Sequence, residues 1–200
     1  MDFFGTVKKI LSMPAKFFSG LKKENTLANS FLYFAIITAF STVMGFIFQT
    51  LFPQLSYDIL KTFYGLNFPN THTFSIVARA LFTIIGYAIM LGFSFAVVGL
   101  LHLWIMIFDG KEEYVKTYQL YAYSSTPNAL LGWIPFISSV TWIWGMILLI
   151  IGTQKMHGIP KNKAILMYVI PAIILVIIYI LFLILFIPFL KTILANLPVQ

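Results

Sequence analysis

The sequence has no cysteine and few charged residues. Only 10% of its 200 residues are Asp, Glu, Lys or Arg, whereas soluble domains carry roughly 25%. The lack of cysteine excludes disulfides, thiol catalysis and cysteine-ligated metals. The low charge accompanies 60% hydrophobic residues and a mean hydropathy of +0.93. Together these values exclude an ordinary soluble domain and predict an all-α, polytopic integral membrane protein.

The charges that are present are mainly lysines near the ends of apolar runs. The formal net charge is +7, and Arg79 is the only arginine among 13 basic residues. Lysines in such places are typical of contact with anionic lipid head groups. We expect the bilayer and its anionic lipids as partners, and no nucleic acid.

The apolar runs predict one membrane domain, residues 29–190, with about five transmembrane helices and a short tail at 191–200. The expected spans are 29–52, 74–108, 118–134, 139–153 and 163–190. The second run has no turn signal and, at 1.5 Å per residue, predicts one tilted helix of roughly 52 Å. The third and fourth runs are at or below the lower limit for a full crossing. They fit either two thin spans or a re-entrant hairpin.

Residues 1–28 form a basic leader. Its apolar residues recur every three or four positions, which predicts an amphipathic helix in the plane of the lipid head groups, bent at Pro14. The alternative is a frayed basic tail. The residues expected to contact lipid head groups are Lys8, Lys9, Lys16, Lys22 and Lys23.

The distribution of lysine predicts the orientation in the membrane. With the amino terminus inside, the inner segments hold ten lysines and the outer segments hold two. Basic residues gather on the cytoplasmic side. We therefore expect a cytoplasmic amino terminus and, after five spans, an outside carboxyl terminus.

A row of small residues marks one side of the second span. Small side chains let a neighbouring helix approach closely, although such residues are common in membrane helices by chance. The candidate helix-packing face consists of Ala88, Gly92, Ala96 and Gly99.

The third run contains the most unusual composition of the membrane domain. Polar groups inside a bilayer must face other helices or a wet cavity. The candidate cluster for helix packing or for a cavity comprises Tyr118, Tyr121, Tyr123, Ser124, Ser125, Thr126, Pro127, Asn128 and Pro135.

Signals for catalysis are weak. Arg79 lies close enough to a helix end for its head group to extend to the interface, and His102 is expected to pack between helices. The histidines at 72 and 157 fall on opposite sides of the membrane, so no metal site can use all three. We expect no enzyme activity, no catalytic residue, no cofactor and no metal.

The order of several short motifs resembles the Yip1 domain family. The likeness rests on Tyr121-Ala-Tyr123, Thr126-Pro127, Ile134-Pro135, Trp142…Trp144, and Gly152…His157-Gly158-Ile159, and it covers about residues 9–185. The resemblance implies five membrane helices with a cytoplasmic amino terminus. Eukaryotic members act in vesicle traffic with Rab-type GTPases and carry a long cytoplasmic leader. The short leader here is similar to prokaryotic members and does not favour a GTPase partner.

Two functions follow from these observations. The first is a non-enzymatic scaffold or adaptor in the bilayer, linked to membrane organisation or trafficking and assembling with itself or with other membrane proteins. The alternative is a small channel or transporter that uses the polar, proline-broken third helix. Its localisation would be a prokaryotic cell membrane.

Overall fold

The computed structural model describes residues 2–21, 26–53, 55 and 74–195, and its regular elements are all helices. Lys22 and Lys23 of the leader and residues 196–200 of the tail lie outside the described residues. The elements are α1 (Phe3–Ser12), α2 (Pro14–Leu21), α3 (Leu27–Leu51), α5 (Ile76–Ile107), α6 (Tyr114–Ser124), α7 (Thr126–Leu131), α8 (Ile137–Met156) and α9 (Lys161–Ala195).

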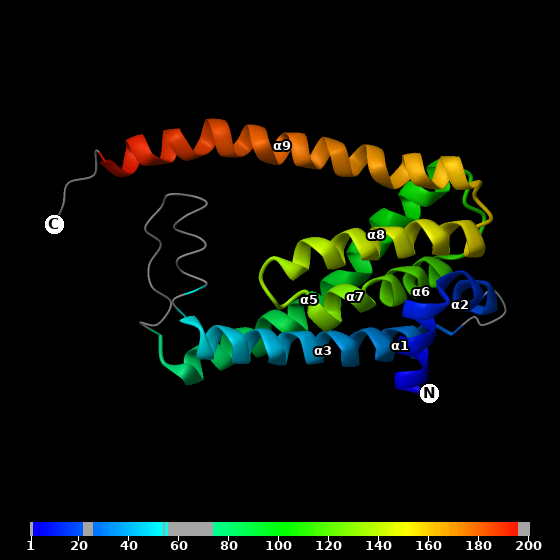
Figure 1. Cartoon of the computed structure of the whole chain (residues 1–200), viewed down its shortest axis with the longest axis horizontal. Helices are drawn as coiled ribbons and strands as arrows, with labels where there is room; N and C mark the ends of the chain where they lie inside the picture. The colour runs from blue at the N-terminus through cyan, green and yellow to red at the C-terminus, as the bar shows by residue number, and fades with distance from the viewer. Residues whose placement is uncertain (1, 22–25, 54, 56–73, 196–200) are drawn as a thin grey trace.

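The helices run back and forth along the long axis of the molecule (Figure 1). α3 runs away from α1 and α2, and α5 returns behind it. α6 and α7 follow end to end in the direction of α3, α8 returns, and α9 runs away again along the opposite side. As a result, α1 and the carboxyl end of α9 lie at opposite ends of the long axis.

Four of the described helices are long and apolar enough to cross a membrane, namely α3, α5, α8 and residues 161–186 of α9. The expected third span is not one helix: α6 and α7 have 11 and 6 residues and meet at Ser125. The turn between α7 and α8 also stops short of the carboxyl end of α3 along the long axis (Figure 1). The chain is an integral membrane helical protein.

The observed helix ends differ from the expected span limits where polar residues have partners. α6 begins four residues before the expected third span, because Lys116 and Thr117 are buried and bonded rather than solvated. α8 begins two residues before the expected fourth span and ends three residues after it, which gives it 20 residues. α9 continues through the start of the expected tail to Ala195.

The core of the bundle is centred on α6. Eight of its 11 residues are buried, and it packs against α3, α5 and α8. Tyr118 and Leu120 are completely buried on this helix, and Leu148 meets the core from α8. A segment with mixed polarity therefore lies inside, while the most apolar helices lie outside it.

The leader forms two helices, and its apolar side faces protein. The break between α1 and α2 falls at Met13, directly before the proline that was expected to bend the leader. Ile10 and Phe18 are completely buried, and the Phe17 ring meets that of Tyr123 at 5.0 Å. Protein therefore covers much of the apolar side of the leader. The position of the leader in the head-group plane stays a prediction.

The polar side of the leader stays outside the bundle. The leader lysines in the described chain, which are all exposed, are Lys8, Lys9 and Lys16. Their contact with lipid head groups remains a prediction.

The small-residue row on α5 does not pack against any described helix of this chain. Ala88, Gly92 and Ala96 are exposed, and Gly99 is half-buried. A Cβ atom added at Gly92 or Gly99 would meet no described atom within 4 Å. α5 instead uses the side that carries Ser94, Val98 and Ile105, because these residues face α6 and the core.

Candidate functional site

The break between α6 and α7 is stabilised by a chain of hydroxyl groups. Pro127 has no N–H, so it cannot donate to the Tyr123 carbonyl four residues earlier. The Thr126 hydroxyl donates to that carbonyl instead, at 2.6 Å. Because its single hydrogen is used there, the Tyr33 hydroxyl must be the donor in its 2.8 Å bond to Thr126 Oγ1. α3 is thereby hydrogen-bonded to the chain at the break between α6 and α7.

Other members of the polar cluster also pack between helices. The Ser94 hydroxyl donates to the Leu91 carbonyl at 2.6 Å, so the Tyr118 hydroxyl donates to Ser94 at 3.1 Å. The Tyr123 ring lies 4.9 Å from that of Tyr33, between α3 and the leader. These side chains connect α6 to α3 and α5, and they are not open to a ligand.

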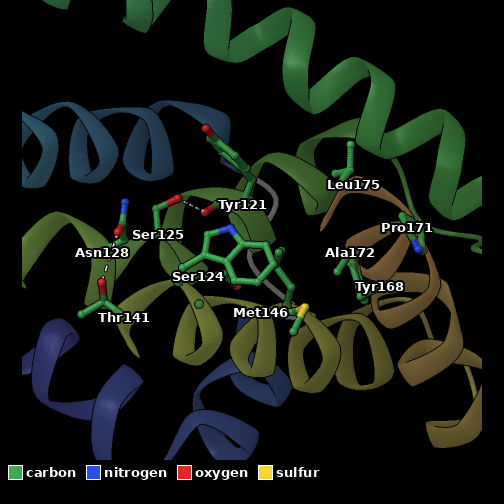
Figure 2. A pocket seen from close by; sticks show the side chains of 13 residues that line it. Tyr121, Ser124, Ser125, Asn128, Thr141, Met146, Tyr168, Pro171, Ala172 and Leu175 are labelled. Carbon is green, nitrogen blue, oxygen red and sulfur yellow. Dashed lines mark hydrogen bonds between the residues drawn. The ribbon is translucent and has the colours of Figure 1, made fainter. Parts of the chain in front are cut away.

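A cavity of about 400 Å³ lies on the other side of the break, between α6–α7, α8 and α9. α8 contributes Thr141, Gly145 and Leu149, which recur every four residues and so share one side of the helix. α9 contributes Tyr168, Pro171, Ala172 and Leu175 in the same manner (Figure 2). The full set of lining residues is Tyr121, Ser124, Ser125, Asn128, Thr141, Trp142, Gly145, Met146, Leu149, Tyr168, Pro171, Ala172 and Leu175.

One wall of this cavity is polar (Figure 2). The Ser125 hydroxyl donates to the Tyr121 carbonyl at 2.8 Å, and the Thr141 hydroxyl donates to Asn128 Oδ1 at 3.2 Å. Ser124 is 2% exposed, and its Oγ has no hydrogen-bond partner in the described chain. The wall therefore combines satisfied groups with one unpaired hydroxyl.

A second hollow of about 230 Å³ lies on the α3 side of the break. Thr38, Ser41 and Thr42 of α3 contribute to its lining. Tyr121, Ser125 and Asn128 line both hollows. The broken helix thus separates two partly polar spaces.

The structure divides the predicted cluster into two groups. Tyr121, Ser124, Ser125 and Asn128 line the cavity, whereas the packing members are Tyr118, Tyr123, Thr126 and Pro127. Pro135 belongs to neither group, because it lies in the turn before α8.

Sequence reasoning missed Thr141 and Tyr168 as parts of this cavity. Each is a polar residue in an apolar run, four residues from a small residue that lines the same space, Gly145 and Ala172 respectively. That spacing is the signal that could have found them.

A histidine pair, buried His157 and half-buried His102, lies near the α5–α6 end of the bundle. The Thr117 hydroxyl lies 2.8 Å from His102 Nδ1 and 3.4 Å from His157 Nε2. Burial, and secondarily the charge of His102, lower the pKa of His157 from 6.5 to about 4. His102 therefore packs between helices, as expected, but it does so within a cluster that the sequence did not reveal.

The loop between α5 and α6 is tied to the start of α9. Lys163 pairs with Asp109, and the hydrogen bond that Lys163 donates, followed by its positive charge, lowers the pKa of the Asp109 carboxyl. Nearby, the Lys116 ammonium donates to the Leu21 carbonyl at 2.7 Å, at the carboxyl end of α2. These contacts gather the leader, the loop and α9 at one end of the molecule.

At the other end, Arg79 is held by protein. Its guanidinium donates to Thr50 Oγ1 at 2.8 Å and lies over the Phe46 ring at 5.7 Å. Within the described residues, no group of three or more His, Asp or Glu side chains is placed to hold a metal ion.

Comparison with known proteins gives one match. The sequence profile of the Yip1 domain matches residues 8–185, which is most of the chain. No curated protein and no solved structure matches the chain. The profile covers the leader, the polar α6–α7 segment and most of α9, and it confirms the resemblance seen in the motifs: this chain belongs to the Yip1 domain family.

Proposed function

We propose that this protein is a non-enzymatic scaffold in the bilayer and that α9 is the helix that meets its partners. The observation that supports this proposal is that α9 extends beyond the other helices of the bundle (Figure 1). Along residues 176–182 the side chains are uncovered on every side of the helix. The residues that define this segment, each 48–55% exposed, are Val176, Ile177, Ile178, Ile180, Leu181 and Phe182.

Lipid tails can cover such a helix, but so can a helix of another membrane protein. The described helix packed most closely against α9 is α8, which meets its first part. Association in lipid depends on close packing rather than on a hydrophobic driving force. A helix that leaves its own bundle offers its whole circumference for that packing, and we propose a transmembrane helix of a second polypeptide as the partner.

Site-specific photocrosslinking in native membranes tests this proposal. A photoreactive amino acid at Val176 should give an adduct that contains a second polypeptide, identified by mass spectrometry. Ile89 is a matched control, because it is 65% exposed but lies on α5. Only lipid adducts at Val176, or the same protein adducts at both positions, would refute a scaffold role for α9.

We further propose five membrane crossings, with α6 and α7 together as the third. The directions of the helices support this count, because α6–α7 runs opposite to both α5, which precedes it in the chain, and α8, which follows it (Figure 1). The lysine distribution supports a cytoplasmic amino terminus and an outside carboxyl terminus. We also propose a prokaryotic cell membrane as the location.

The two hollows favour a second candidate function, a small channel or carrier. Asn128 borders both of them, so a solute that passes the break would meet its amide. Flux into proteoliposomes should then be lost in Asn128→Leu. It should persist in Asn162→Leu, which makes the same exchange at an exposed position outside both hollows. Equal flux in protein-free vesicles would remove this candidate.

A further inference from the structure

Ser124 lines the 400 Å³ cavity, and its buried Oγ has no hydrogen-bond partner in the described chain. Leaving a buried donor unsatisfied costs about 1–3 kcal/mol. A ligand that accepts a hydrogen bond from Ser124 would recover that free energy. The neighbouring Asn128 amide has a similar capacity, because its oxygen accepts from Thr141 while its NH₂ group is a donor.

The cavity selects against charge. None of its described lining residues is Lys, Arg, Asp or Glu. Its lining residues on α8, from Thr141 to Leu149, and on α9, from Tyr168 to Leu175, all fall within the candidate membrane spans of these two helices. A charged group at such a depth would cost about 2.5 kcal/mol or more without a partner. The polar part of the occupant must therefore be uncharged.

The remaining wall is apolar and belongs to helices that face lipid. Trp142 and Leu175 both line the cavity, and they are 51% and 62% exposed. A hydrocarbon chain can therefore leave the cavity along α8 and α9 without meeting polar groups. The volume is within the range of about 300–1,000 Å³ that is usual for small-molecule sites.

We propose that this cavity binds an uncharged membrane lipid, whose carbonyl group accepts hydrogen bonds from Ser124 and Asn128 and whose chain extends into the bilayer beside Trp142 and Leu175. The site is distinct from the uncovered part of α9 on which the scaffold role depends. The lipid would enter sideways from the hydrocarbon phase rather than from water.

The experiment uses the full chain in phosphatidylcholine vesicles and three photoreactive probes. Diacylglycerol, phosphatidylcholine and phosphatidylglycerol probes carry the same ester groups and the same diazirine acyl chain, so they differ only in the head group. Diacylglycerol should label the cavity-lining peptides of α8 and α9 about tenfold more than either phospholipid, or more strongly still. Equal labelling by all three probes would overturn the proposal.

Two variants test the assignment to this cavity. Ala172→Phe fills it and should abolish the preference for diacylglycerol. Ala80→Phe adds the same volume to an apolar hollow between α3 and α5 and should leave the preference intact. If Ala172→Phe labels like the unaltered chain, the lipid does not occupy this cavity.

Ser124→Ala tests the hydrogen bond itself. It should reduce diacylglycerol labelling by about fivefold, as expected for one hydrogen bond. The stability of the empty protein should not fall, because the Ser124 hydroxyl has no partner to lose in the described chain. Undiminished labelling in this variant would refute the role of Ser124.

Discussion

The Thr126 hydroxyl stabilises the α6–α7 break, because it donates to the Tyr123 carbonyl and accepts from the Tyr33 hydroxyl. In Thr126→Val, the shape is nearly retained, but the Tyr33 hydroxyl loses its acceptor and the Tyr123 carbonyl loses the hydrogen bond from Thr126, which Pro127 cannot replace. Each buried group left unpaired costs about 1–3 kcal/mol. We expect this variant to lose about 2–4 kcal/mol of unfolding free energy.

Tyr33→Phe should cost much less. It removes the donor to Thr126 but leaves the bond from Thr126 to the Tyr123 carbonyl in place. Hydrogen bonds between membrane helices average about 0.6 kcal/mol in double-mutant cycles, with a maximum of about 1.7. In the double variant Thr126→Val/Tyr33→Phe, position 33 carries no hydroxyl that could be left unpaired. The combined loss of unfolding free energy should therefore be smaller than the sum of the two single losses.

Reversible unfolding of the purified protein in mixed micelles measures all three variants. Thr83→Val is the matched control, because the Thr83 hydroxyl donates to the Arg79 carbonyl of its own helix and has no bond to another helix of the described chain. That substitution should change the unfolding free energy by less than about 0.5 kcal/mol. If Thr126→Val and Tyr33→Phe cost the same and add independently, the proposed hydroxyl chain is wrong.

Three further predictions concern the leader and the histidine pair. Gly152→Val should lower the unfolding free energy by about 1–3 kcal/mol, because the new Cβ would crowd Leu120 and lie 3.2 Å from the Phe18 ring. The resulting displacement of the leader should be visible as faster tryptic cleavage. An unchanged rate would argue against this packing. The pKa of His157 is about 4 when folded and 6.5 when unfolded, so stability should be complete above pH 6.5 and should fall by up to about 3 kcal/mol as the pH drops to 4. His157→Gln should flatten this part of the pH profile of unfolding, and an unchanged profile would contradict the assignment. Replacing three of the five leader lysines, Lys8, Lys9 and Lys16, with glutamine should weaken binding to anionic lipid by roughly 3 kcal/mol. Lipid retained in native mass spectrometry measures this, and equal retention would remove their proposed role.

The sequence predicts the long helices well because their signal is local. Apolar runs flanked by lysine place α3, α5 and α9, and Pro14 and Pro127 mark the two breaks in shorter helices. The polar character of residues 118–128 also predicts that they face other helices or a cavity, and in the structure Tyr118, Thr126 and Pro127 are buried. Such features depend on neighbours along the chain.

Features that depend on contacts between distant segments could not be predicted in the same way. Lys116 looks like a solvated loop residue, yet it is buried because the carboxyl end of α2 supplies a carbonyl 95 residues away. The leader has the amphipathic pattern of a helix on a lipid surface. The same pattern also fits packing against a protein surface, so the sequence alone could not show that Ile10 and Phe18 enter the core. Thr141 and Tyr168 become cavity residues only because α8 and α9 lie side by side.

The central claim is that the chain crosses the membrane an odd number of times, so that its two ends lie on opposite faces. The absence of cysteine allows a direct measurement with Lys8→Cys and Gln200→Cys and a membrane-impermeant maleimide. We predict that Lys8→Cys reacts only in inverted membrane vesicles and that Gln200→Cys reacts only in intact cells. Reaction of both variants from the same side would show an even number of crossings and would contradict the account.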